Sequence, residues 1–281
     1  MKNDRRLWLK ALVSLPLATA LPASANALET IHQRGRLRVA VYNDFPPYSL
    51  AGGKGIDADI ARAIAAKLGV TAEIVGYNAD EDMNDDLRNM VWKGHYLRGN
   101  PADVMLHVPV DPVLGAANEQ VRIFAPYHYE VMGMARIASR VPAPEGSSAI
   151  ALEVFTREKV GVEGDTLADA FLGAAMHGRL RANIAHFRSV GEAVAALRED
   201  RVSAVMAPRG EIEGALAGDT RFAIDDVRIG ELNPKRWPLG MAVKAEADEL
   251  AGALSDALEA LRKDGTLAAI FQRHGVTLRA Q

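Results

Sequence analysis

Four aromatic residues stand where they could form the walls of a small-molecule site. Tyr42 and Phe45 follow an apolar segment at residues 37–41, Tyr48 ends the sequence FPPY, and Tyr127 lies further along the chain. A tyrosine ring offers an apolar body with a polar tip, which suits a small organic ligand. We therefore predict a ligand site at these residues. For Phe45, packing in the core is an equally good interpretation.

Polar residues in two further segments could complete such a site. His107 and Asp111 belong to the sequence HVPVDP, which follows an apolar strand-like segment at 103–106. Asp165 and Thr166 precede a helical pattern, where they could cap the helix or help its free N–H groups to bind an anion. One residue can serve both purposes, so both interpretations stay open.

Motifs of the common enzyme classes are absent from the sequence. It holds no GxSxG, GxGxxG, P-loop or HExxH motif and no cysteine. The acidic run at 80–86 lacks the spacing and central glycine of a calcium loop, and negative charge before a helix is stabilising without an ion. We predict a protein that is not an enzyme and that needs no cofactor or metal.

Short β-branched segments alternate with helical patterns along most of the chain. This alternation is typical of βαβ units and largely parallel sheets. A cluster of Pro, Gly and Ser at 141–148 interrupts the pattern, which then restarts and so predicts a second lobe. We expect strands at 37–41, 70–75, 103–106, 159–162, 202–206 and 237–243, and helices at 57–68, 85–93, 166–172, 190–197, 248–263 and 267–274.

The first 27 residues have the order of a cleavable export signal. Basic residues precede an apolar stretch at 11–21, and the sequence Ala25-Asn26-Ala27 follows it. We predict cleavage after Ala27 and a periplasmic protein. The pair Arg5-Arg6 leaves the Sec and twin-arginine routes both open. Cleavage removes four basic residues and one acidic residue, which takes the formal charge from −3 to −6 and argues against a nucleic-acid partner.

Four segments in this order resemble the family 3 extracellular solute-binding proteins. They are LRVAVYNDFPPY with GIDADI at 37–60, ADVM with IFAPY at 102–127, KVGVEGDT at 159–166, and LGMAVK with AL, DGTL and IF at 239–271. The resemblance covers nearly all of the chain after residue 27. It implies a two-lobe α/β fold of the type II periplasmic binding class, in which each lobe is a mostly parallel sheet flanked by helices.

The same resemblance implies how the chain is divided and what it does. Lobe 1 would comprise residues 28–133 plus 237–281, lobe 2 residues 134–236, and two crossover strands near 132–136 and 233–238 would act as a hinge. A monomer would close on a small ligand in the cleft and deliver it to an ABC-type permease in the inner membrane.

The ionic anchors of the amino-acid binders in this family are missing. Asn118 stands where the family has an arginine for the ligand carboxylate, and Pro208 where it has an aspartate for the ammonium group. Arg122 or Arg209 could replace the arginine from a shifted position. We therefore expect a polar organic ligand that is not a standard zwitterionic amino acid.

A second resemblance supplies an alternative function. The loop at 107–112 and the sequence LRNM at 87–90 with Gly94 look like parts of the binding-protein-like components associated with quinoprotein (PQQ) alcohol dehydrogenases. That resemblance implies an accessory or partner protein of a periplasmic dehydrogenase. A few relatives of the fold are dehydratases that use one carboxylate in the cleft, so Asp111 with His107 keeps a minor catalytic alternative.

Together these arguments predict a set of ligand-binding residues. The set is Tyr42, Phe45, Tyr48, His107, Val108, Pro109, Asp111, Asn118, Arg122, Tyr127, Asp165, Thr166, Pro208 and Arg209.

Overall fold

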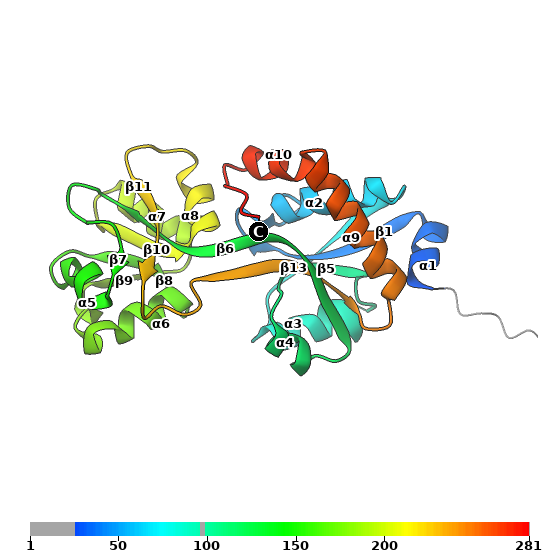
Figure 1. The fold of residues 1–281 in the computed structure, drawn as a ribbon, viewed down its shortest axis with the longest axis horizontal. Coiled ribbons are helices and arrows are strands. Elements are labelled where there is room, and N and C mark those ends of the chain that lie inside the picture. Colours follow the sequence, from blue (N-terminus) through cyan, green and yellow to red (C-terminus); the bar gives the residue numbers. More distant parts are fainter. Residues whose placement is uncertain (1–25, 96–98, 281) are drawn as a thin grey trace, which may run out of the picture.

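A computed structural model describes residues 26–95 and 99–280. The predicted export signal, apart from Asn26 and Ala27, lies outside the described residues. The chain forms two α/β lobes joined by two long strands, β6 (Val121–Arg136) and β13 (Arg236–Lys244) (Figure 1). The predicted fold class is confirmed.

Lobe 1 is a sheet with helices on both faces. Strand β1 pairs in parallel with β4 and β5, and β13 pairs antiparallel with β5. The strands are β1 (Arg36–Tyr42), β4 (Thr71–Tyr77) and β5 (Val104–Pro109), with a small hairpin of β2 (Asp44–Phe45) and β3 (Ser49–Leu50). The helices are α1 (Ala27–Arg34), α2 (Ile56–Lys67), α3 (Met83–Leu87), η1 (Arg88–Trp92), α4 (Pro112–Ala117), α9 (Asp248–Lys263) and α10 (Thr266–Arg273).

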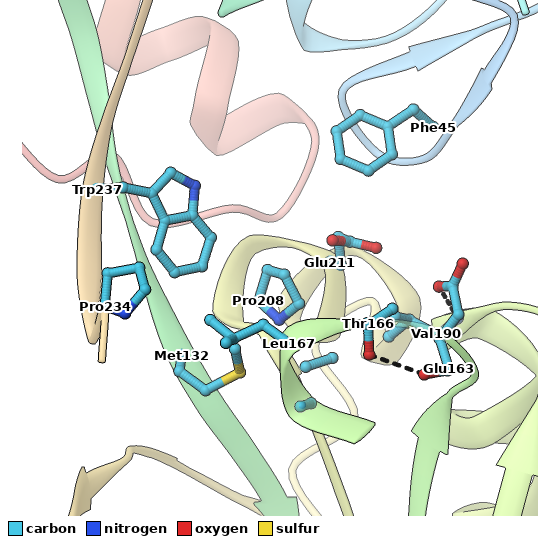
Figure 2. A pocket seen from close by; sticks show the side chains of 12 residues that line it. Phe45, Met132, Glu163, Thr166, Leu167, Val190, Pro208, Glu211, Pro234 and Trp237 are labelled. Carbon is cyan, nitrogen blue, oxygen red and sulfur yellow. Dashed lines mark hydrogen bonds between the residues drawn. The ribbon is translucent and has the colours of Figure 1, made fainter. Parts of the chain in front are cut away.

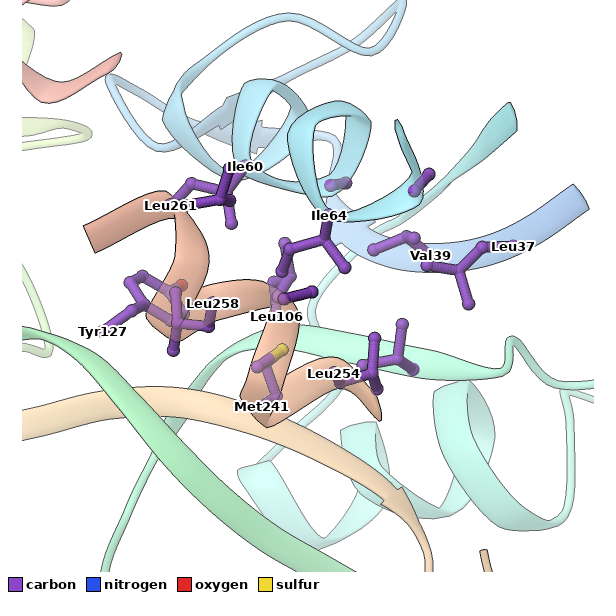
Figure 3. Close-up of a cluster of buried hydrophobic side chains, with 14 of the residues drawn as sticks. Leu37, Val39, Ile60, Ile64, Leu106, Tyr127, Met241, Leu254, Leu258 and Leu261 are labelled. Carbon is purple, nitrogen blue, oxygen red and sulfur yellow. The ribbon is translucent and has the colours of Figure 1, made fainter. Parts of the chain in front are cut away.

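Alternation along the strands of lobe 1 gives two cores. Val39 and Val41 face the larger core, which they share with Ile60 of α2 and Leu254 of α9 (Figure 3). Ala40 points to the opposite face, into a smaller core beneath α3 and η1. Successive side chains of a strand point to opposite faces, so both faces of this sheet must be covered.

Lobe 2 repeats the arrangement with different strands. Strand β8 pairs in parallel with β9 and β10, and β10 and β11 pair antiparallel with β6. The strands are β7 (Glu145–Gly146), β8 (Val160–Glu163), β9 (Ile184–Phe187), β10 (Ala204–Pro208), β11 (Ala223–Asp226) and β12 (Arg228–Ile229). The helices are α5 (Ser148–Ala151), η2 (Glu153–Thr156), α6 (Leu167–Ala174), η3 (Ala175–Gly178), η4 (Arg181–Asn183), α7 (Val190–Arg198) and α8 (Arg209–Leu216).

Strand β6 belongs to the sheets of both lobes. Residues 121–131 pair with β13, whereas residues 132–136 pair with β10 and β11. The predicted crossovers at 132–136 and 233–238 fall at this junction. The crossover strands run antiparallel to their neighbours, so each sheet mixes parallel and antiparallel pairs. The lobe boundaries given above stay a prediction.

The last residues, 276–280, return to the junction of the lobes, and we call them the C-terminal tail (Figure 1). The backbone N–H of Thr277 donates to Glu213 Oε2 of α8 at 2.7 Å. The guanidinium of Arg279 lies 3.3 Å from Asp226 Oδ1 of β11, and its backbone N–H donates to His128 Nδ1 at 3.2 Å. Beside β6 and β13, the tail is thus a third connection between the lobes.

Candidate functional site

Two cavities lie at the junction of the lobes and share Phe45 and Trp237. The inner cavity has a volume of about 230 Å³. The outer cavity measures about 620 Å³ and is more open to solvent. The inner cavity is lined by Phe45, Met132, Glu163, Thr166, Leu167, Ala168, Val190, Ala207, Pro208, Glu211, Pro234 and Trp237 (Figure 2). The outer cavity is lined by Tyr42, Asp44, Phe45, Asn78, Ala79, Met83, His107, Pro109, Trp237 and Leu239.

The ends of strands in lobe 2 bring the polar residues to the inner cavity. Glu163 ends β8, and Pro208 ends β10. Thr166 caps α6, and its hydroxyl donates to the carbonyl of Glu163 at 2.7 Å. Glu211 lies in the first turn of α8. Carboxyl ends of parallel strands and the helix starts that follow them converge at one edge of a sheet, where α/β proteins bind ligands.

Aromatic rings from lobe 1 and the crossover form the opposite walls. Phe45 belongs to the small hairpin after β1, and Trp237 to β13 (Figure 2). Phe45 stacks on Tyr48, with 5.6 Å between the ring centroids, and forms a T-shaped pair with His107, with 4.8 Å between the centroids. These neighbours hold the ring of Phe45 in place at the mouth of the inner cavity.

The inner cavity is acidic. The side chain of Glu211 is 9% exposed, and within the described residues its carboxyl makes no hydrogen bond. Burial, followed by the charges of Glu163 and Glu130, raises the pKa of Glu211 well above its usual range. Burial also raises the pKa of Glu163, whose Oε2 accepts the backbone N–H of Val190 at 3.2 Å. No Lys, Arg or His is among the described residues that line this cavity.

Behind the aromatic wall, two predicted ligand tyrosines are buried, each 1% exposed. The hydroxyl of Tyr127 donates to Asp57 Oδ1 at 2.8 Å and accepts the backbone N–H of His107 at 3.0 Å. The hydroxyl of Tyr48 donates to Glu130, which also accepts the backbone N–H of Gly210 at 3.2 Å. Both hydroxyls are therefore occupied inside the protein and are not presented to a ligand.

Several other predicted residues do not reach the cavities. Val108 is buried in the smaller core of lobe 1. Asp111 is exposed and caps α4, with its Oδ1 accepting the backbone N–H groups of residues 113 and 114. Asn118 is buried and donates to Asn84 Oδ1 at 2.7 Å. Asp165 is exposed on the turn before α6 and does not line either cavity.

Both candidate arginines are paired with carboxylates of the protein. Arg122 forms an ion pair with Asp248 at 2.6 Å, at the far end of β6. Arg209 lies between Glu213, at 2.7 Å, and Asp226, at 2.9 Å. Arg209 therefore directs its Nε and Nη1 to carboxylates of lobe 2.

Six of the predicted residues do line the cavities. Phe45 lines both, while Thr166 and Pro208 line the inner one. The other three, Tyr42, His107 and Pro109, line the outer one. His107 and Asp111 do not form a catalytic pair, because Asp111 faces solvent and His107 Nδ1 lies 3.2 Å from Asp57 Oδ2.

Sequence reasoning missed the carboxyls of Glu163 and Glu211 and the ring of Trp237. Glu163 directly follows the predicted strand at 159–162, and Trp237 lies in the predicted crossover at 233–238, so position along the chain could have indicated both. Glu211 follows Gly210, in a segment without a predicted element.

The acidic run at 80–86 is used within lobe 1. Asp82 caps α3, and Asp86 Oδ2 accepts the hydroxyl of Tyr42 at 2.6 Å. Asp80 Oδ2 accepts the side-chain amide of Asn89 at 2.6 Å. Within the described parts of the chain, no group of three or more His, Cys, Asp or Glu side chains is placed to hold a metal ion.

Solved structures share this architecture. An ancestral cationic amino acid solute-binding protein superposes with a TM-score of 0.68 at 21% identity, covering 88% of this chain and 99% of the other. An amino acid ABC transporter substrate-binding protein from Streptococcus pneumoniae, bound to L-arginine, gives 0.60 at 18% identity over 91% of this chain and 100% of the other. The chain shares the two-lobe fold of these structures.

A third similar structure is the solute receptor for L-cysteine of Neisseria gonorrhoeae. Its TM-score is 0.56 at 22% identity, covering 89% of this chain and 93% of the other. No family model matches the sequence, and no curated protein matches it either. At these identities the likeness concerns the fold. In residues 26–95 and 99–280, no helix is long and apolar enough to cross a bilayer.

Proposed function

We propose that this chain is an exported solute-binding protein that captures a small organic ligand between its lobes and delivers it to an ABC-type permease. The observation that carries the proposal is the inner cavity, whose walls come from both lobes and from the two crossover strands. A similar structure is that of an amino acid ABC transporter substrate-binding protein, which agrees with it. The predicted signal ending at Ala27 would place the protein in the periplasm.

Capture would work by closure about the crossover strands. Phe45 belongs to lobe 1, Glu163 and Glu211 to lobe 2, and Trp237 to β13, so one ligand can contact all three parts. A ligand favours the closed form only by binding it more tightly than the open form. Contacts that exist only when the lobes approach supply that difference.

The residues support a binder rather than an enzyme, and a ligand other than a zwitterionic amino acid. Asn118, Arg122 and Arg209 all lie away from the inner cavity or are paired elsewhere, so the carboxylate of an amino acid would have no basic partner there. The catalytic alternative loses its pair, because Asp111 and His107 are not brought together.

Thermal-shift screening of residues 28–281 against amino acids, organic acids, alcohols and amines tests the proposal. A ligand at about 100 times its Kd adds about 2.7 kcal/mol to the free energy of unfolding, which raises Tm by several degrees. The ligand must be recovered unchanged. Trp237→Leu should abolish the shift, whereas Trp92→Leu, in η1 and outside both cavities, should keep it.

An unshifted Tm with every compound would contradict capture. Co-purification of the unliganded protein with a periplasmic quinoprotein dehydrogenase would then support the partner role predicted from the loop at 107–112.

A further inference from the structure

We propose that the inner cavity selects an organic cation, namely an amine or ammonium group on an apolar body without a carboxylate. The inference rests on the proposed function and names the class of ligand.

Glu211 has the burial and the unpartnered carboxyl that a cationic ligand would suit. The residue is 9% exposed and lines the inner cavity, and its carboxyl makes no hydrogen bond within the described residues. Glu130 and Glu163 are close enough to raise its pKa further, and Tyr48 is the other titratable group beside it. A buried carboxyl without a partner is costly, and a cation from the ligand would complete it.

The charges of the residues that line the two cavities also favour a cation. Neither cavity has an arginine or lysine among the described residues that line it. Arg209, two residues before Glu211, directs its guanidinium to Glu213 and Asp226. His107 is the one histidine in the lining of the outer cavity, and its Nδ1 lies beside Asp57. An anionic ligand would meet carboxyls without a counter-charge.

The aromatic pair above the carboxyls would likewise attract a cation. Figure 2 shows Phe45 and Trp237 around the same space as Glu211. The face of an aromatic ring attracts a cation by about 0.5–2 kcal/mol, and Trp is the strongest of the three aromatic residues. The remaining walls are largely apolar, with Met132, Leu167 and Val190 among them. This combination fits a positive head group on an apolar body.

The volume of the inner cavity suits a small ligand. A cavity of roughly 150 Å³ accommodates one benzene molecule. The inner cavity, at about 230 Å³, therefore has room for one ring or a short alkyl chain together with an ammonium group. A longer ligand would extend past Phe45 into the outer cavity, where Asp44 adds another carboxylate.

The same charges would make closure depend on a cation. Asp44 belongs to lobe 1 and Glu163 to lobe 2, and the charge of Asp44 contributes to the raised pKa of Glu163. Bringing the lobes together thus brings like charges together. A cation between them reverses the sign of this interaction, so the closed form would be favoured with an amine and opposed without one.

Isothermal titration calorimetry with four probes of similar shape tests the inference. They are 2-phenylethylammonium, the neutral 2-phenylethanol, zwitterionic phenylalanine and anionic 3-phenylpropanoate. We expect the cation to bind at least about tenfold more tightly than each of the other three, a difference of about 1.4 kcal/mol. Equal or tighter binding of the alcohol, the zwitterion or the anion would overturn charge selection while leaving solute capture intact.

Variants connect the selectivity to the cavity. Glu211→Gln should weaken the cation by about tenfold or more and leave the alcohol unchanged. Glu153→Gln, an exposed glutamate on the outside of lobe 2, is the matched control and should change neither. Unchanged cation affinity in Glu211→Gln would overturn the assignment. If none of the four probes binds and no compound shifts Tm, the proposed function fails together with the inference.

Discussion

At the scale of single residues, the proposed selection of a cation depends most on Glu211. A carboxyl that is buried without a hydrogen bond lowers stability, and a fold would tolerate it where the group serves a ligand. Glu163 and Glu130 add to the cost because they bring like charge to the same region. The cavity should therefore show a trade-off, in which the change that improves stability removes binding.

That trade-off gives a pH-dependent prediction for Glu211→Gln. Burial raises the pKa of Glu211 above its ordinary value of 4.5, so the folded protein holds this proton more tightly than the unfolded chain. The stabilisation is fully present below that value and is lost as pH rises through the raised pKa. A glutamine side chain does not titrate, so the variant does not lose this stabilisation as pH rises. Its free energy of unfolding should exceed that of the wild type at about pH 8 and approach it near pH 5.

Urea denaturation at both pH values measures the difference. A variant that is less stable than the wild type at the higher pH would contradict the buried, unpaired state of Glu211. The difference includes the effect of the Glu211 charge on Glu130 and Glu163, because the three carboxyls interact.

Position along the chain accounts for the predicted residues that line the inner cavity. Phe45, Thr166 and Pro208 line the inner cavity because turns after strand ends and helix starts meet at the cleft. Tyr48 and Tyr127 come from equally suitable segments, yet their hydroxyls bond to Glu130 and Asp57 in the interior. The direction of a side chain depends on distant partners, which local sequence does not specify.

At the scale of elements, α8 of lobe 2 packs against the turn that follows β1 in lobe 1. A Cβ on Gly210 would lie 2.0 Å from the hydroxyl oxygen of Tyr48, and one on Gly214 would lie 2.6 Å from Cγ of Pro47. The backbone of α8 therefore rests directly on lobe 1. Glycine at both positions permits this approach.

Gly210→Ala should push α8 away from the turn of lobe 1 that contains Tyr48. The added methyl group must displace Tyr48 or α8, and overpacking of this kind costs about 1–3 kcal/mol. Gly252→Ala, on the exposed face of α9 with no atom within 4 Å, is the control and should stabilise the protein by about 1 kcal/mol or less. Chemical denaturation measures both, and similar effects in the two variants would contradict the close packing of α8.

These glycines also explain why α8 was not predicted. Two glycines in eight residues lower helix propensity, so the segment gives a weak helical pattern. The 16-residue strand β6 was recognised only in part because its two halves face different lobes, and its burial pattern changes along its length. Tertiary contacts rather than local propensity determine both elements.

At the scale of the whole molecule, three segments connect the lobes. Strands β6 and β13 continue from one sheet to the other, and the C-terminal tail joins His128 of β6 to Glu213 and Asp226 of lobe 2. Burial lowers the pKa of His128 to about 3, so its ring is neutral near pH 7 and can accept the backbone N–H of Arg279. The tail contacts should therefore persist at neutral pH.

Ending the chain after Val276 should loosen the lobes. The truncation removes the donors of Thr277 and the charge of Arg279 while keeping Val276 in the larger core of lobe 1. We expect a loss of about 1.5–3 kcal/mol in the free energy of unfolding, the range for hydrogen bonds to charged groups, with a further contribution from the lost contact of Leu278 with that core. Denaturation curves identical to those of the full chain would show that the tail contributes no connection.

The order of elements predicted the architecture well. The restart of the βαβ pattern after residues 141–148 indicated two lobes, and the crossovers at 132–136 and 233–238 fall where β6 changes partners. The mixed sheets were not foreseen, because strand direction follows from how the crossovers return and not from the composition of any strand.

Closure on a ligand is the central claim, and a distance measured across the cleft tests it most directly. The sequence has no cysteine, so spin labels at Ala66→Cys in α2 and Ala182→Cys in η4, both exposed, would report one lobe against the other. We predict that double electron–electron resonance shows a shorter and narrower distance distribution when a compound that raises Tm is added. An unchanged distribution with that compound bound would contradict capture by closure.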